Sequence, residues 1–161
     1  MIVPLIITAA GMFFFYSQIG LTHTFTGLIL AHTALGTPFV VITVTATLTG
    51  FDTNLIRASQ SLGANTLRTF FKVIMPLILP GVISGALFAF ITSFDEVVVV
   101  LFIGSIEQVT IPKQMWAGLR QETSPVILSM ATCLVFLSIA LLTTVELLRR
   151  RSERLRGIKS R

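Results

Sequence analysis

The sequence predicts an all-α integral membrane protein with about four transmembrane helices. Of its 161 residues, 53% are hydrophobic and only 12% are charged, and the mean hydropathy is +0.89. Soluble proteins are about a quarter charged. Fifty-one residues also precede the first charged side chain, Asp52. A spanning helix needs roughly 20 apolar residues, so the apolar content allows at most about four crossings.

The net charge of +5 belongs to the C-terminal tail and not to a binding face. Seven of the twelve Lys and Arg residues lie within residues 149–161, and the 148 residues before them carry five basic and six acidic groups. A nucleic-acid partner is therefore not expected. A single cysteine, Cys133, excludes an internal disulfide, and with only two histidines beside it a zinc site is not expected either.

The uncharged N-terminal run is long enough for two crossings. We expect the first at about residues 2–16 and the second at 24–49, with Tyr16 at the membrane interface. The first is short, because about 15 residues rise about 22 Å against a hydrocarbon core near 30 Å. It also has no positively charged flank, so it does not fit a signal peptide. We therefore expect Met1 to be an internal start that lacks an upstream part.

Two further apolar segments follow. Residues 81–103 are long enough to cross and are interrupted only by Asp95 and Glu96, and residues 124–148 form the expected fourth span. The segment between them, 104–123, is of mixed composition.

The basic residues predict the orientation. Three Lys or Arg residues lie in the loop 51–79 and seven in the tail 149–161, whereas the segment 104–123 has two and the turn 17–23 has none. Positive charges accumulate on the cytoplasmic side. The loop, the tail and the N-terminus are therefore expected in the cytoplasm.

The loop 51–79 is expected to form two short amphipathic helices. The first would cover residues 55–62 and end at Gly63 with positive φ, and the second would cover 67–75 and end at Pro76. A loop folded on its own bundle or lying on the membrane is an alternative. The expected capping residues are Asp52, Thr53 or Asn54 for the first helix, and Asn65 and Thr66 for the second.

A segment of this loop resembles a known family. Residues 57–76 read R-A-S-Q-S-L-G-A-N-T-L-R-T-F-F-K-V-I-M-P, which is similar to the EAA loop of bacterial ABC importer permeases. That motif is E-A-A, three residues, Gly, nine residues, Ile, one residue and Leu-Pro. Ala58, Gly63 and Pro76 match it, and Val73 stands at the isoleucine position.

The resemblance implies an ATPase-coupling site, because the first short helix of such loops docks in a groove of the ATPase subunit. Arg57 stands at the motif's glutamate and reverses its charge. Either the usual polar contact is lost, or the partner compensates with an acid. The residues that the resemblance assigns to coupling are Leu55, Arg57, Ala58, Ser59, Leu62, Gly63, Ala64 and Pro76.

The resemblance covers nearly the whole chain and narrows to spermidine/putrescine permeases. The segments that carry it are Met1-Ile2-Val3-Pro4, G-L-I-L-A-H at 27–32 with P-F-V-V at 38–41, and S-F-D-E-V-V-V at 93–99. Such permeases have six spans, so residues 1–161 would be the C-terminal part of the transmembrane domain. The implied partners are ABC ATPase subunits, a second permease subunit and an external solute-binding protein, in the bacterial inner membrane. The chain has no Walker-type glycine loop, so ATP would be used by the ATPase, and no cofactor is expected.

Asp95, Glu96 and Ser93 are the candidate substrate-pathway residues. On a continuous helix from Gly81, Asp95 would lie about 21 Å along the axis, with Glu96 about 100° around it. Ionisable groups inside a membrane are costly and usually face a cavity or a partner. A carboxylate here suits a cationic substrate such as a polyamine, whereas the alternative is that it caps or bonds a neighbouring helix. His32 is expected to hydrogen-bond across the bundle.

These features predict a non-enzymatic permease subunit that moves a small cationic solute by alternating access. A truncated membrane subunit that does not transport is the alternative, and a stand-alone secondary transporter is a third possibility.

Overall fold

The computed structural model describes residues 3–121 and 125–155, and within these ranges all regular structure is helical. Three of the helices, α4, η1 and α5, follow each other without a break and form one continuous helix, Thr66–Phe94. The helices in chain order are α1 (Leu5–Gln18), α2 (Phe25–Thr49), α3 (Asn54–Ser61), α4 (Thr66–Thr69), the π-helical turn η1 (Phe70–Ile74), α5 (Met75–Phe94), α6 (Val98–Ile103), α7 (Ile111–Gln121) and α8 (Pro125–Leu155).

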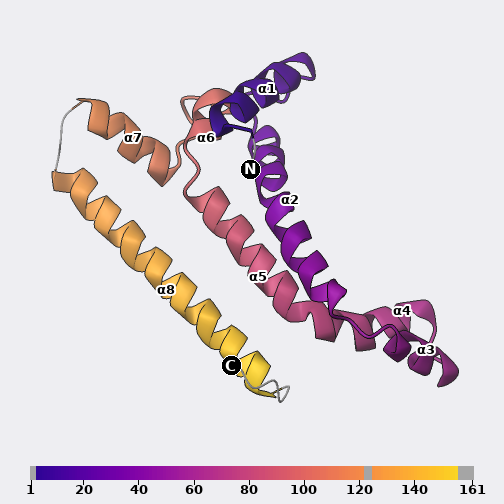
Figure 1. Cartoon of the computed structure of the whole chain (residues 1–161). Helices are drawn as coiled ribbons and strands as arrows, with labels where there is room; N and C mark the ends of the chain where they lie inside the picture. The colour runs from indigo at the N-terminus through magenta and orange to yellow at the C-terminus, as the bar shows by residue number, and fades with distance from the viewer. Residues whose placement is uncertain (1–2, 122–124, 156–161) are drawn as a thin grey trace.

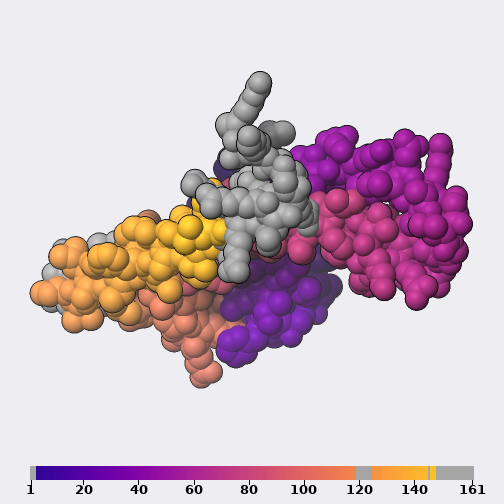
Figure 2. All heavy atoms as spheres, turned by 90° about the horizontal axis from the view of Figure 1, so that it is seen from below, coloured from indigo at the N-terminus to yellow at the C-terminus, as the bar shows by residue number. Residues whose placement is uncertain are grey.

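The chain is elongated, with α5 between α2 and α8 (Figure 1). Helices α3 and α4 lie at one end, called here the α3 end, and α1 and α6 lie at the other, called the α6 end. In the space-filling view the atoms of α3 and α4 form the tip of the molecule (Figure 2). Helices α3 and α4 are therefore separated from the segment 93–99 by about the length of α5.

The predicted all-α membrane fold is confirmed. Three apolar helices are long enough to cross a bilayer: Phe25–Thr49, Thr66–Phe94 and Pro125–Thr144. The first expected crossing, at residues 2–16, differs, because α1 has only 14 residues and rises about 21 Å. It packs against α6. Where the membrane boundaries lie on these helices remains a prediction.

Close packing of α2 against α5 depends on small residues. A Cβ atom on Gly81 would clash with Thr47 Oγ1, and one on Gly85 would clash with Thr43 Oγ1. On the other helix, a Cβ on Gly36 would lie 2.9 Å from the Cβ of Ala89. Small residues let two backbones approach closely, which is how helices associate in membranes. These small residues therefore let α2 and α5 pack closely along the middle of the molecule.

The helix expected at 67–75 does not end at Pro76. It passes through η1, where the Met75 N–H donates to the carbonyl of Phe70, five residues earlier, and continues as α5. Proline lacks an N–H, and its ring clashes with the carbonyl four residues before it in a regular α-helix. The wider π turn just before Pro76 makes room for the ring, so the proline is accommodated inside the helix.

The third apolar segment also differs from the expected span at 81–103. Its helix begins at Thr66 and ends at Phe94, and residues 95–97 separate it from α6. The apolar residues 98–103 belong to this separate short helix.

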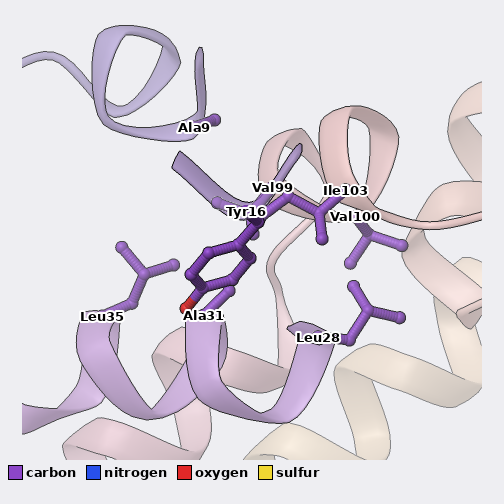
Figure 3. Close-up of a cluster of buried hydrophobic side chains, with 8 residues drawn as sticks. All are labelled: Ala9, Tyr16, Leu28, Ala31, Leu35, Val99, Val100 and Ile103. Atoms are coloured by element: carbon purple, nitrogen blue, oxygen red, sulfur yellow. The ribbon is translucent and has the colours of Figure 1, made fainter. Parts of the chain in front are cut away.

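Helix α6 packs into a buried cluster at the α6 end. The Tyr16 ring, only 8% exposed, points from α1 toward Ala31 and Leu35 of α2 (Figure 3). The ring thus lies between α1 and α2, and its expected position at the membrane interface remains a prediction. The members of the cluster are Ala9, Tyr16, Leu28, Ala31, Leu35, Val99, Val100 and Ile103.

Candidate functional site

Helix α3 forms as the loop sequence predicts. Asp52 accepts a hydrogen bond from the Asn54 N–H at its start, 2.9 Å from N to Oδ1, whereas the Thr53 side chain makes no capping bond. The helix ends with Leu62 as its C-cap, and Gly63 follows with φ +81°. Gly63 is therefore at the position where glycine is preferred over any residue with a Cβ.

The turn after α3 is a Schellman motif. The Gly63 N–H donates to Gln60 O at 2.9 Å, and the Ala64 N–H donates to Ser59 O at 3.1 Å. Asn65 caps the N-terminus of the next helix, α4, as predicted: its Oδ1 accepts a hydrogen bond from the Arg68 N–H at 2.8 Å. These bonds define the geometry of the helical hairpin formed by α3 and α4.

A second contact holds the hairpin together. The hydroxyls of Ser59 on α3 and Thr69 on α4 lie 2.9 Å apart, and Thr69 is only 2% exposed. The Ser59 hydroxyl also lies 2.8 Å from Ile56 O. One side of α3 is thereby fixed against the start of the continuous helix Thr66–Phe94.

The outer surface of the hairpin exposes large apolar side chains. Leu62 is 89% exposed, and Leu55, Leu67 and Phe71 are also exposed. An apolar surface of this kind marks an interaction site with protein or membrane. The structure places seven of the eight residues assigned to coupling together, on α3 and the turn after it. Pro76 is the exception, because it lies in the first turn of α5.

Ser93 and His32 join α5 to α2. The His32 Nδ1 atom lies 2.8 Å from the Ser93 hydroxyl, which confirms the expected bond across the bundle. Both side chains line an apolar cavity of about 860 Å³ beside α2 and α5. Its other polar lining residues are Thr33, Thr37, Gln108 and Thr110.

Asp95 and Glu96 do not share a helix, so the expected 100° relation between them is wrong. Asp95 directly follows α5, so its expected distance of about 21 Å from Gly81 along the axis fits the structure. Asp95 caps the C-terminus of α5 and is exposed, whereas Glu96 is 5% exposed and its Oε1 accepts from the Val99 N–H at 2.8 Å. Glu96 thus bonds one of the free N–H groups at the start of α6, where an acceptor is favourable. The capping alternative therefore describes Glu96.

Asp95 faces a different space from Ser93. It lines a cleft of about 380 Å³ formed by α5, α7 and α8, together with Met115 and Leu134. The rings of Phe90 and Phe94, stacked with centroids 5.6 Å apart, line both this cleft and the larger cavity. The three pathway candidates are neighbours in the chain but are not brought together around one space.

The segment 103–110 is held by a network that the sequence did not indicate. Gln108 is 6% exposed, accepts from the Ser105 N–H at 3.0 Å and donates to His23 O at 3.3 Å. The Lys113 ammonium donates to the carbonyls of Ser105 and Gln108 at 2.7 and 3.0 Å. A single glutamine in a polar segment gives no sequence signal for such a role. The basic side chains of the tail 149–161 lie outside the described residues.

Comparisons with known proteins identify relatives over nearly the whole chain. The sequence model of the family described as "Binding-protein-dependent transport system inner membrane component" matches residues 1–155. The spermidine/putrescine transport system permease protein PotC of Haemophilus influenzae is 32% identical over 152 residues, which are 94% of this chain and 59% of that protein. PotC of Escherichia coli K12 is 31% identical over 150 residues, 93% of this chain and 57% of that protein. The putrescine transport system permease protein PotI of the same strain is 32% identical over 106 residues, 66% of this chain and 38% of that protein. The chain thus spans less than two thirds of the length of these relatives.

Proposed function

Because the chain belongs to the family of inner-membrane components of binding-protein-dependent transport systems, we propose that it is a permease subunit of an ATP-binding-cassette importer. It would act in the inner membrane with ABC ATPase subunits, a second permease subunit and an external solute-binding protein. Family members of this kind are transport components and not enzymes, so ATP hydrolysis would belong to the ATPase.

The α3–α4 hairpin is the proposed ATPase-coupling site. The single observation that carries this proposal is the exposed helix α3 at the tip of the molecule, joined through one turn to the helix Thr66–Phe94. An ATPase that moves on binding ATP would displace α3, and the displacement would act on α5. ATP binding drives such a change only through different contacts with the two states.

The same proposal sets the orientation. The α3 end would face the cytoplasm with the tail 149–161, since ten Lys or Arg residues lie in these two segments. The α6 end, with α1 and the segment 103–110, would then face the external binding protein. The cytoplasmic N-terminus expected from the sequence does not fit this orientation, because α1 lies at the end opposite α3.

A polyamine is the proposed substrate class. The names of the relatives support it, and so does Asp95, an exposed carboxylate in an otherwise mainly apolar cleft at the end of α5. Ser93 would line the neighbouring cavity. Glu96, which bonds the start of α6, would act by positioning that helix.

The test is purification of the tagged chain from its native membrane, combined with uptake of labelled putrescine and spermidine by cells that depend on it. Recovery of an ATPase and a second permease, with uptake lost on deletion, is the expected result. Recovery of the chain alone from membranes that contain the ATPase would contradict the proposal and favour a membrane subunit that does not transport.

A further inference from the structure

Arg57 occupies the centre of the outward face of α3. Ser59 bonds Thr69 and so marks the side of α3 that faces α4. Two residues along a helix are about 200° apart around its axis, so Arg57 points nearly opposite to that contact. It is exposed, and within the described part of the chain its guanidinium has no hydrogen-bond or ion-pair partner.

The neighbours of Arg57 on this face are small and polar. Asn54 and Ser61 lie three and four residues away, which places them beside it on the helix surface. The Ser61 hydroxyl donates to the Arg57 carbonyl at 3.0 Å, so it is already engaged by the helix backbone. The guanidinium is therefore the group on this face with the most unused hydrogen-bonding capacity, namely five N–H donors in a planar fork.

The charge of the hairpin is positive. Arg57, Arg68 and Lys72 are all exposed, and the one acidic residue of the loop, Asp52, bonds the backbone at the start of α3. A surface that docks against Arg57 removes the guanidinium from water, which is costly unless an acid replaces the lost hydration. Complementary charge also sets the register of a docked helix.

Resting on the function proposed above, we propose that the ATPase groove that receives α3 is acidic and presents a carboxylate to Arg57. The planar fork of the guanidinium suits a bidentate contact with one carboxylate. The partner is thus specified as an ATPase whose groove carries an Asp or Glu opposite the middle of α3. An ATPase with a basic or neutral group there would not pair productively with this chain.

The test measures binding of the ATPase to the full chain, purified with its second permease in detergent. Arg57→Glu should weaken binding at least tenfold, whereas Arg57→Lys, which keeps the charge but not the fork, should weaken it only a few-fold. Gln114→Glu is the control, because it adds an acidic side chain at an exposed position of α7, at the opposite end of the molecule from the hairpin. It should change binding less than threefold. Circular dichroism and gel filtration verify that each variant is folded.

A charge exchange provides the second measurement. Each Asp and Glu of the ATPase groove is changed to Lys, and one of these variants should bind Arg57→Glu at least tenfold better than the unchanged ATPase does. Equal binding of wild type and Arg57→Glu would overturn the inference while leaving the proposed function intact. Equal losses in Arg57→Glu and Gln114→Glu, or failure of every exchange, would do the same. Failure of the wild-type chain to bind the ATPase would overturn both.

Discussion

Replacing Gly63 by alanine tests whether the turn after α3 controls coupling. Gly63 has φ +81°, and a Cβ there would meet no atom within 4 Å, so the effect of alanine is conformational and not steric. A residue with a Cβ in the left-handed region costs roughly 1–2 kcal/mol. That cost reduces the population of the Schellman turn relative to its alternatives by a factor of about 5–30. Helix α3 has only eight residues and is too short to be stable alone, so its position depends on this turn.

The assay for Gly63→Ala has two parts. Putrescine uptake should fall several-fold while the amount of chain in the membrane stays normal, and amide hydrogen exchange should accelerate at Gly63 and Ala64. Gly50→Ala, at the end of α2 just before the loop, is the control, because Gly50 has φ −91° and equally open surroundings. Gly63→Asn should retain most of the uptake, since asparagine tolerates positive φ. Normal uptake and exchange in Gly63→Ala would refute the reasoning.

Three further substitutions test other parts of the structure. Gly85→Leu should destabilise the chain by about 1–3 kcal/mol or prevent its folding, since any Cβ there clashes with Thr43, whereas Gly11→Leu, with no atom within 4 Å, should leave the melting temperature in detergent unchanged. Glu96→Ala should cost about 1–3 kcal/mol by leaving the buried Val99 N–H without its acceptor, and Glu96→Gln, which keeps an acceptor, should cost less in the same melting assay. Asp95→Asn should raise the KM for putrescine uptake without changing that melting temperature, and unchanged uptake kinetics would assign Asp95 a packing role.

The local features of the fold were predictable where a single residue dictates the backbone. Gly63 in the left-handed region and Asn65 as a helix cap follow from the chemistry of those side chains, and both are observed. Pro76 shows the limit of this reasoning. Its missing N–H and its ring do forbid a regular α-helix, but a π turn over the preceding residues satisfies the same constraint without ending the helix.

The features that depend on two distant segments were not predictable in the same way. The apolar run at 97–103 looks like a continuation of α5, because hydropathy does not detect the break in the helix at residues 95–97. Glu96 stabilises this break by accepting a hydrogen bond from Val99 at the start of α6. The sequence alone does not show why Gly81 and Gly85 must be glycine, because the clash that a Cβ would make there is with α2. For Asp95 and Glu96, adjacency in the chain indicated a shared role, yet one is exposed in a cleft and the other is a buried cap.

The close packing of α2 on α5 determines how a movement of α3 would be transmitted to the α6 end. The helix Thr66–Phe94 has 29 residues and spans about 43 Å. Along it, the contacts of Gly81 and Gly85 with α2 leave no room for one helix to slide past the other without a clash. At its far end the bond between His32 and Ser93 fastens the same pair. A displacement of α3 is therefore expected to move α2 and α5 together. It would then be absorbed where the backbone is no longer helical, at residues 95–97, next to the carboxylate proposed to meet the substrate.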